Sequence, residues 1–172
     1  MKTRTPAVAA VAGPAGPGMT TVDHDFSVTP VRQVGQDCGL LACIESIARD
    51  RHIRIDQTSL SWRYPHYRRK GSADRGRVGV RAALEIMADL GLSSNSETVH
   101  GRALGVLTAK IPSGVLLCVE DDLGGTRWWR LAAIEPGGVR VMQPESADPA
   151  HFAVLTWDEL EARHGCALAF DL

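Results

Sequence analysis

The stretch that decides the fold runs from Gln33 to Ala48 and reads QVGQDCGLLACIESIA. After Asp37, apolar residues recur at intervals of three and four, which is the pattern of one buried helix face. That face holds Leu40, Leu41, Ile44, Ile47 and Ala48, with Glu45 and Arg49 off it. Asp37 stands where a helix N-cap belongs. The pattern therefore predicts a helix whose first residues are Cys38 and Gly39.

Cys38 is the residue with the clearest chemical meaning. At the first turn of a helix, a thiol lies beside unpaired backbone N–H groups and the positive end of the helix dipole, which favour the thiolate. Gly39 leaves room for a substrate backbone, and the Gln33 amide could donate to the oxyanion formed when the sulfur attacks a carbonyl. The segment is typical of a nucleophile with electrophilic support. It is equally consistent with a small apolar residue at a helix start beside an ordinary loop glutamine.

Length and composition limit the possible functions. The chain has 172 residues, enough for one core, and its 19 Lys and Arg against 20 Asp and Glu give a net charge of −1. This balance argues against a nucleic-acid or membrane partner held by overall charge. The longest apolar stretches, such as Gly114 to Val119, fall far short of the roughly 20 residues of a spanning helix, so no membrane span is predicted.

Motifs for cofactors and metals are missing from the sequence. There is no GxGxxG or Walker phosphate loop, no HExxH and no GxSxG elbow, so no cofactor is predicted. The four cysteines, Cys38, Cys43, Cys118 and Cys166, form no CxxC pair and have no histidine at zinc-finger spacing. The pattern favours reduced thiols over a zinc site or a disulfide framework, and no metal site is predicted.

The N-terminal 22 residues form a separate region. They are rich in Pro, Ala and Gly and show no apolar period, so residues 1–22 are predicted to be a disordered tail and residues 23–172 a single domain. Lys2, Arg4 and the Ala-Val run resemble a signal peptide, but the apolar part is short and is broken at Gly13-Pro14. The sequence therefore favours a cytoplasmic protein over a secreted one.

Beyond Ala48, the period of the chain changes from helical to extended. A second helix is predicted from about Val80 to Leu90, with Gly91 as its stop. Between the helices, a basic loop with interleaved aromatic residues is predicted from Trp62 to Arg81. Strands are predicted at residues 114–119, 128–134, 139–142 and 167–170, with a hairpin turn at 136–138 and a short capped helix at 156–163. Helices followed by an antiparallel sheet predict an α+β domain.

The segment from Gln33 to Ala48 resembles the nucleophile segment of the papain-like cysteine peptidases. It is similar to the calpain version, with Gln, then Gly-Asp-Cys, then an apolar helix, and to the double-glycine leader peptidases of bacteriocin exporters. The later elements follow the exporter-peptidase order, so the resemblance spans Val28 to Leu172. It implies a papain-like domain in which N-terminal helices pack on a C-terminal antiparallel sheet, with Cys38 as nucleophile and Gln33 at the oxyanion.

Two positions depart from that family pattern. In the family, the first hairpin strand opens with a catalytic histidine, and here Arg127 or Trp128 stands at that position. The second strand closes with Asp-Pro or Asn-Pro, and here it closes with Gln143-Pro144. Gln143 can accept a hydrogen bond from an imidazole, although it does not stabilise an imidazolium as a carboxylate does. The resemblance therefore implies an incomplete catalytic set.

Trp128 and Arg130 are candidate substrate-binding residues. Successive side chains of a strand point to opposite faces, so Trp128 or its neighbour Trp129 is expected to line the cleft beside Cys38. Arg130 shares the face of Trp128 and is positioned to meet a carboxylate. An aromatic wall of this kind suits an apolar peptide or acyl chain.

Three functions are consistent with the sequence. The first is a papain-like cysteine peptidase or related thiol acyl-transfer domain that uses Cys38, Gln33 and Gln143. The second is a silent pseudo-peptidase that binds a peptide or partner protein in the same cleft through Gly39, Trp128 and Arg130. The third is an effector or toxin-like domain whose basic loop grips an acidic partner. The missing histidine favours the second, and the Asp37-Cys38-Gly39 motif favours the first.

Overall fold

The computed structural model describes residues 24–25, 27–35, 38–65, 75–92, 95–100, 114–120, 125–148, 150–163 and 166–171. The predicted tail at 1–22 lies outside these ranges. So do Asp37 and residues 66–74 of the predicted basic loop.

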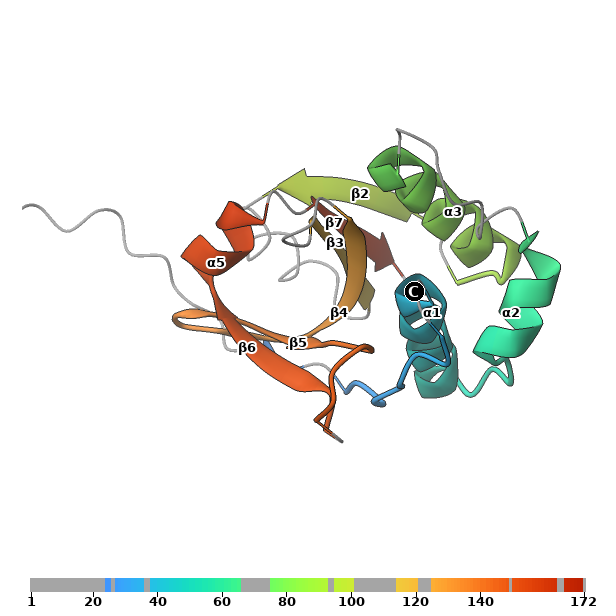
Figure 1. The fold of residues 1–172 in the computed structure, drawn as a ribbon, viewed down its shortest axis with the longest axis horizontal. Helices are drawn as coiled ribbons and strands as arrows, with labels where there is room; N and C mark the ends of the chain where they lie inside the picture. The colour runs from blue at the N-terminus through green and yellow to red at the C-terminus, as the bar shows by residue number, and fades with distance from the viewer. Residues whose placement is uncertain are drawn as a thin grey trace, which may run out of the picture.

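Helix α1, Gly39–Asp50, is the central element of the molecule. Every residue from Leu40 to Ala48 is buried, Glu45 included, because the helix lies between the sheet on one side and two further helices on the other (Figure 1). The structure places the N-cap at Cys38, one residue later than the predicted Asp37. Of the two residues predicted to lie off the buried face, Glu45 is buried and Arg49 is exposed, so the exposed part of the helix begins at Arg49 in its last turn.

Helices α2, Gln57–Arg63, and α3, Arg75–Asp89, complete the helical layer. Asp56 caps α2 by accepting a hydrogen bond from the Ser59 N–H at 2.7 Å. The predicted basic loop is thus wrong at both ends, because its first residues belong to α2 and its last to α3. The predicted stop at Gly91 is confirmed: its φ of 65° is a conformation that glycine adopts without strain.

Within the described ranges, the sheet has seven strands, and every strand pair is antiparallel. Six strands follow the order β2-β7-β3-β4-β5-β6, and β1 pairs with β4. Their bounds are β1 His24–Asp25, β2 Asn95–His100, β3 Gly114–Glu120, β4 Thr126–Glu135, β5 Gly138–Met142, β6 Phe152–Thr156 and β7 Cys166–Asp171. The four predicted strands and the hairpin turn between β4 and β5 are confirmed. Strands β1, β2 and β6 were not predicted.

The sheet is curled (Figure 1), and the buried apolar side chains of the described residues form two cores, one on each of its faces. One core lies between the sheet and helices α1 to α3, and it includes Trp128 and Cys118. The other lies on the opposite face, where helix α5, Trp157–Ala162, contributes Leu160. Thr156 and Glu159 form a capping box at the start of α5, as predicted. The observed fold is therefore the predicted α+β arrangement of helices packed on an antiparallel sheet.

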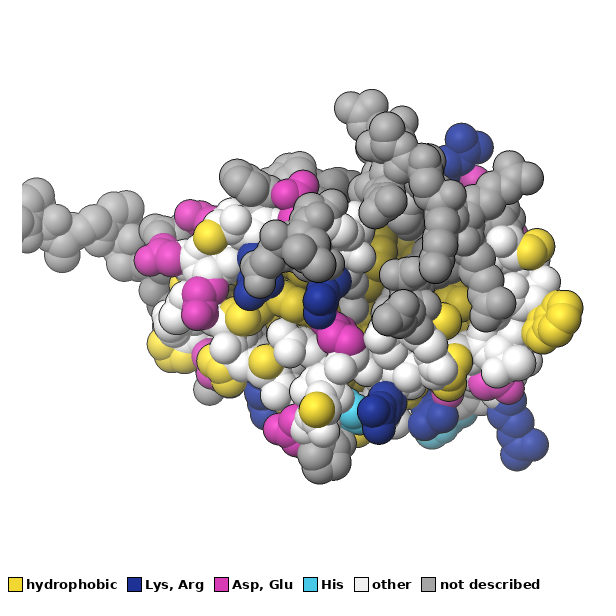
Figure 2. Space-filling model, viewed as in Figure 1, with side chains coloured by type: hydrophobic (Ala, Val, Ile, Leu, Met, Phe, Trp, Pro, Cys, Tyr) yellow, Lys and Arg dark blue, Asp and Glu magenta, His cyan; other side chains and the backbone are white. Residues whose placement is uncertain are grey.

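Among the described residues, no helix is both long enough and apolar enough to cross a bilayer. On the face drawn in Figure 2, basic and acidic side chains are interspersed, in keeping with the net charge of −1.

The close approach of β5 and β6 predicts a strict glycine at position 138. A Cβ built on Gly138 would lie 1.9 Å from the Leu155 carbonyl oxygen, whereas one built on Gly137 meets nothing within 4 Å. We expect Gly138→Ala to lower the free energy of unfolding by about 3 kcal/mol. Gly137→Ala, the matched control in the same turn, should change it by less than about 0.5 kcal/mol. Urea unfolding of both variants measures this, and equal losses would contradict the assigned strand packing.

Candidate functional site

Helix α1 rests on strand β4 along one stripe of residues spaced four, three and four apart: Gly39, Cys43, Ser46 and Asp50. Residues at this spacing share one face of a helix. The Cys43 thiol donates to the Trp128 carbonyl at 3.5 Å. The start of α1, with Cys38, is thereby fixed next to the backbone of the first hairpin strand.

Cys38 lies at the N-cap of α1 and is buried, with 7 % of its surface exposed. Its N–H donates to the Gly35 carbonyl at 3.3 Å, and its sulfur is 3.8 Å from where a Cβ on Gly35 would be. The Cys38 side chain makes no capping bond to the helix, and the first turn of α1 holds no acidic residue. The sulfur therefore lies at the positive end of the helix, beside the Gly35 turn.

Gln33 lies between the start of α1 and the corner that follows β5. Its N–H donates to the Pro144 carbonyl at 3.0 Å. Its side-chain oxygen is 3.5 Å from where a Cβ on Gly39 would be, and that same Cβ would be 3.4 Å from the Trp128 carbonyl. The structure thus brings the predicted site residues Cys38, Gly39 and Gln33 together with the Gln143-Pro144 corner.

Gln143 is held at this corner through its backbone. Its N–H donates to the His151 carbonyl at 2.6 Å, and its carbonyl accepts from the Ser146 N–H at 3.0 Å. The two segments that the sequence singled out, around Cys38 and around Gln143, therefore meet through Gln33.

Gln57 is a residue of the site that the sequence analysis missed. Its side chain donates to the Arg32 carbonyl at 2.9 Å and accepts from the Val34 N–H at 3.0 Å, which clamps the backbone on both sides of Gln33. Buried Glu45 in turn accepts from the Gln57 side chain at 3.0 Å and from its N–H at 3.1 Å. Glutamine and glutamate 12 residues apart carry no local signal of such a contact.

The start of β4 presents three side chains that are engaged elsewhere. The indole of Trp128 packs on α3, where a Cβ on Gly79 would lie 3.3 Å from its Nε1. Arg127 pairs with Glu145 at 3.4 Å, and Trp129 Nε1 donates to the same Glu145 oxygen at 2.7 Å. Trp128 therefore borders the site with its backbone, while its side chain belongs to the helix-facing core.

Arg130 lies inside the molecule. Its side chain is 97 % buried, and its guanidinium donates to Asp50 at 2.6 Å and to Ser46 at 2.7 Å. Burial lowers the pKa of Arg130, and the neighbouring Asp50 carboxylate opposes that shift. The carboxylate that the sequence analysis expected Arg130 to meet is that of the chain's own Asp50. Asp50 also accepts hydrogen bonds from Thr29, so the Arg130–Asp50 pair also holds the segment that leads from Thr29 to Gln33.

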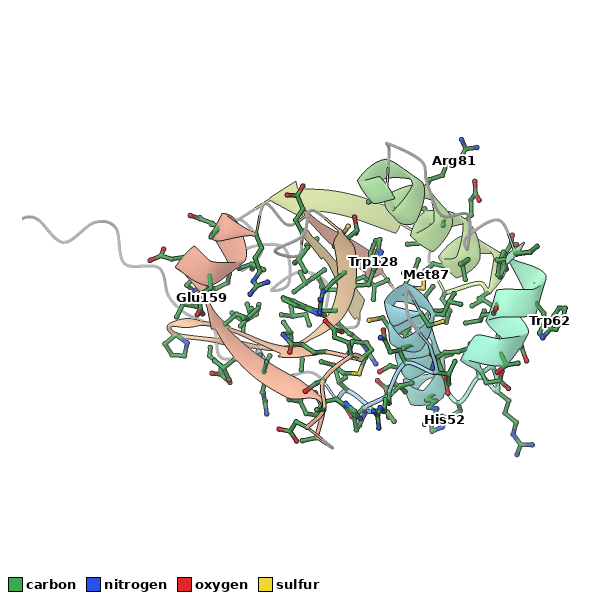
Figure 3. All side chains as sticks on the ribbon, viewed as in Figure 1. His52, Trp62, Arg81, Met87, Trp128 and Glu159 are labelled. Atoms are coloured by element: carbon green, nitrogen blue, oxygen red, sulfur yellow. The ribbon has the colours of Figure 1, made fainter. Side chains whose placement is uncertain are left out.

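Two histidine side chains are described. His52 follows the C-terminal end of α1, whereas Trp128 and Cys38 lie at the other end (Figure 3). Twelve residues of helix separate these ends by about 18 Å, so His52 does not reach the Cys38 sulfur. His151 is buried beside Gln143, with a positive φ of 56° and a ring Nδ1 that has no hydrogen-bond partner. Within the described part of the chain, no imidazole is hydrogen-bonded to Cys38.

In the described ranges, no three His, Cys, Asp or Glu side chains are grouped so as to hold a metal ion. A pocket of about 160 Å³ is lined by Arg51, Ile53, Gly91 and Leu92. It lies at the C-terminal end of α1, away from Cys38.

Helices packed on a curled antiparallel sheet, with a cysteine at the start of the central helix beside the hairpin, form the fold of papain-like cysteine peptidase domains. Solved structures confirm the expected likeness to exporter peptidases. The peptidase domain of Streptococcus ComA, a bi-functional ABC transporter, is similar with a TM-score of 0.58 and 10 % identity, over 81 % of this chain and 96 % of that one.

A double-glycine motif protease from an AMS/PCAT transporter, solved with a leader peptide, is similar with a TM-score of 0.53 and 9 % identity. The match covers 86 % of this chain and 94 % of that one. At such identities, the likeness defines the fold. No protein-family model and no curated protein sequence matches the chain.

The Arg130–Asp50 pair predicts a large and specific loss of stability. Asp50→Ala leaves a buried guanidinium without its carboxylate, and we expect the free energy of unfolding to fall by about 3–5 kcal/mol. Arg81→Ala removes an exposed helical ion pair with Glu85 and should cost less than about 1 kcal/mol. Chemical denaturation of the two variants makes the comparison. A loss for Asp50→Ala as small as the control would mean that Arg130 is solvated.

Proposed function

We propose that this chain binds a peptide where the start of α1 meets β4, and that it binds the peptide without cutting it. The proposal rests first on the fold, since one structural neighbour was solved in complex with a leader peptide. This chain accounts for almost the whole length of both neighbours. A fold alone does not determine activity, so whether the bound peptide is cut depends on the chemistry of the residues at the site.

The observation that carries the proposal is the chemistry of the β4 residues beside Cys38. A thiol peptidase needs a base that takes the thiol proton and returns a proton to the leaving amine. At the positions where the family resemblance calls for histidine, Arg127 pairs with Glu145 and the Trp128 indole packs on Gly79. Neither a guanidinium nor an indole exchanges protons near neutral pH. Loss of general acid–base catalysis costs about 10²- to 10⁴-fold in rate.

Peptide binding is tested with the full chain and a fluorescein-labelled synthetic peptide containing a Gly-Gly pair. We expect fluorescence anisotropy to show binding and mass spectrometry to show that the peptide stays intact. The affinity of Cys38→Ala should stay within about twofold of wild type, because a site that only binds the peptide forms no covalent bond to the Cys38 sulfur. Gly39→Val adds bulk against Gln33 and the Trp128 carbonyl, and we expect it to weaken binding about tenfold, or 1.4 kcal/mol.

The remote Gly137→Ala variant is the control for Gly39→Val, and thermal unfolding checks that both variants fold. Cleavage that disappears in Cys38→Ala would overturn the non-cutting function. Absence of binding in the folded wild-type chain would overturn peptide binding.

A thiol hydrolase or acyl-transfer function is the second candidate, and a separate observation favours it. Cys38 is at the start of a helix of 12 residues, and the Gln33 side chain lies beside the next residue of that helix. A thiol hydrolase needs a nucleophile and an oxyanion donor, and Cys38 and the Gln33 side chain are the candidates for these two roles. The effector-like hypothesis has no such support, because residues 66–74 of its basic segment lie outside the described structure.

The hydrolase candidate predicts selective covalent labelling. A Gly-Gly peptide with a C-terminal vinyl sulfone should modify Cys38 and leave Cys43 intact, since burial raises the pKa of the Cys43 thiol and keeps it protonated. Gln33→Ala should slow the labelling about tenfold if its amide polarises the electrophile. Time-resolved intact-mass spectrometry followed by peptide mapping measures both. Labelling that is unaffected by Gln33→Ala would rule out its role at the oxyanion.

A further inference from the structure

We propose that Cys118 and Cys166 are a modification site, at which a reversible disulfide joins strands β3 and β7. The two cysteines are 48 positions apart in the sequence, and no local pattern relates them. The register of the sheet places them directly opposite each other, at the end of the antiparallel ladder that begins with Gly114 opposite Phe170. This inference concerns a different part of the molecule from the peptide-binding proposal and does not depend on it.

The backbone geometry of such a position fits a disulfide. Directly opposed residues of an antiparallel pair have Cα atoms about 4.5 or 5.5 Å apart, depending on the type of pair. Both values fall within the range of about 4.4–6.8 Å found across disulfides. Opposed positions of an antiparallel pair lie on one face of the sheet, which is the arrangement that a bond across the ladder requires.

The surroundings of Cys118 favour this pairing over others. Cys118 is buried, with 7 % of its surface exposed, in the core that also holds Trp128 and Cys43. Cys43 is on α1, a different element from the β3–β7 ladder, and its thiol is engaged with the Trp128 carbonyl. Cys38 lies beside the Gly35 turn at the start of α1. The register therefore selects Cys166 as the partner of Cys118.

The bond forms by thiol–disulfide exchange with a small-molecule disulfide such as oxidised glutathione. One protein thiolate attacks a sulfur of the small disulfide, which gives a mixed disulfide and releases one thiol. The second protein thiolate then attacks the sulfur of the first cysteine and releases the second thiol. In balance, two cysteines lose two protons and two electrons, and one small disulfide is reduced to two thiols.

Closing this bond constrains the unfolded chain. It would join the ends of the segment that contains β4, β5, β6 and α5, which is the part of the sheet that carries the Gln143-Pro144 corner. A crosslink over a segment of this length removes much of the conformational entropy of the unfolded state. The oxidised form is therefore the more stable one, with Cys38 left as a thiol.

The test uses the full chain, reduced and then incubated while folded with oxidised glutathione. After alkylation of the remaining thiols and proteolysis, mass spectrometry is expected to find the Cys118 and Cys166 peptides linked, with the loss of two hydrogens. The midpoint of thermal unfolding should rise by about 5–10 °C and should return on addition of dithiothreitol.

Matched variants separate this pair from the other thiols. Cys166→Ala should abolish the oxidant-dependent shift, and Cys43→Ala, which removes a cysteine from the same core, should keep it. The mass-spectrometric result on the wild-type chain stands even if a variant fails to fold. Absence of the Cys118–Cys166 link in the oxidised folded chain, or a link that uses Cys38 or Cys43 instead, would overturn the proposal.

Discussion

The contact between helix α1 and strand β4 is the constraint on which the rest of the structure depends. At one end, Gly39 lies against the backbone of Trp128: a Cβ there would be 3.4 Å from the Trp128 carbonyl oxygen, in van der Waals contact, and a longer side chain would have to displace a neighbour. At the other end, Ser46 and Asp50 receive the buried guanidinium of Arg130. A charge in the interior is tolerated only with such partners, so the pairing fixes both the rotation and the height of the helix on the strand. Because these contacts hold α1 at one position on β4, they also fix the position of Cys38 at the start of the helix.

A second set of polar contacts places Gln33. The lead-in from Thr29 to Val34 forms no strand, so its backbone groups find partners in other elements. Asp50 holds Thr29, Gln57 holds Arg32 and Val34, and Pro144 accepts from Gln33 itself. These partners come from α1, α2 and the corner after β5. The position of Gln33 beside the helix start therefore depends on the packing of several elements. Buried Glu45 contributes indirectly, because it accepts a hydrogen bond from the Gln57 side chain.

The fold is like that of solved peptidase domains, and in this chain the aromatic side chains at the start of β4 serve packing. Trp128 fills the space between β4 and α3, which Gly79 leaves open by having no side chain. Trp129, on the opposite face, fixes Glu145 and so holds the chain after Pro144 close to Arg127. Large aromatic side chains contribute much apolar burial to a small domain. A fold stabilised in this way keeps its shape with or without catalysis, which is why fold and activity are separate questions here.

The sequence by itself determined the elements whose signals are local. The apolar period after Asp37 predicted α1, the turn residues at 136–138 predicted the β4–β5 hairpin, and Thr156 with Glu159 predicted the capped α5. Spacing and capping act within a few residues, so they can be read along the chain.

Only the tertiary structure decided which side chains meet. Nothing near Arg130 in the sequence points to Asp50, 80 residues away, and nothing near Glu45 points to its burial against Gln57. The sequence left open whether Trp128 or Trp129 lines a cleft and expected Arg130 to meet a carboxylate. In the structure all three side chains are buried, and Arg130 meets the carboxylate of Asp50. Strand alternation predicts that two residues share a face of a sheet, but the element that covers that face is set by the packing of the whole domain.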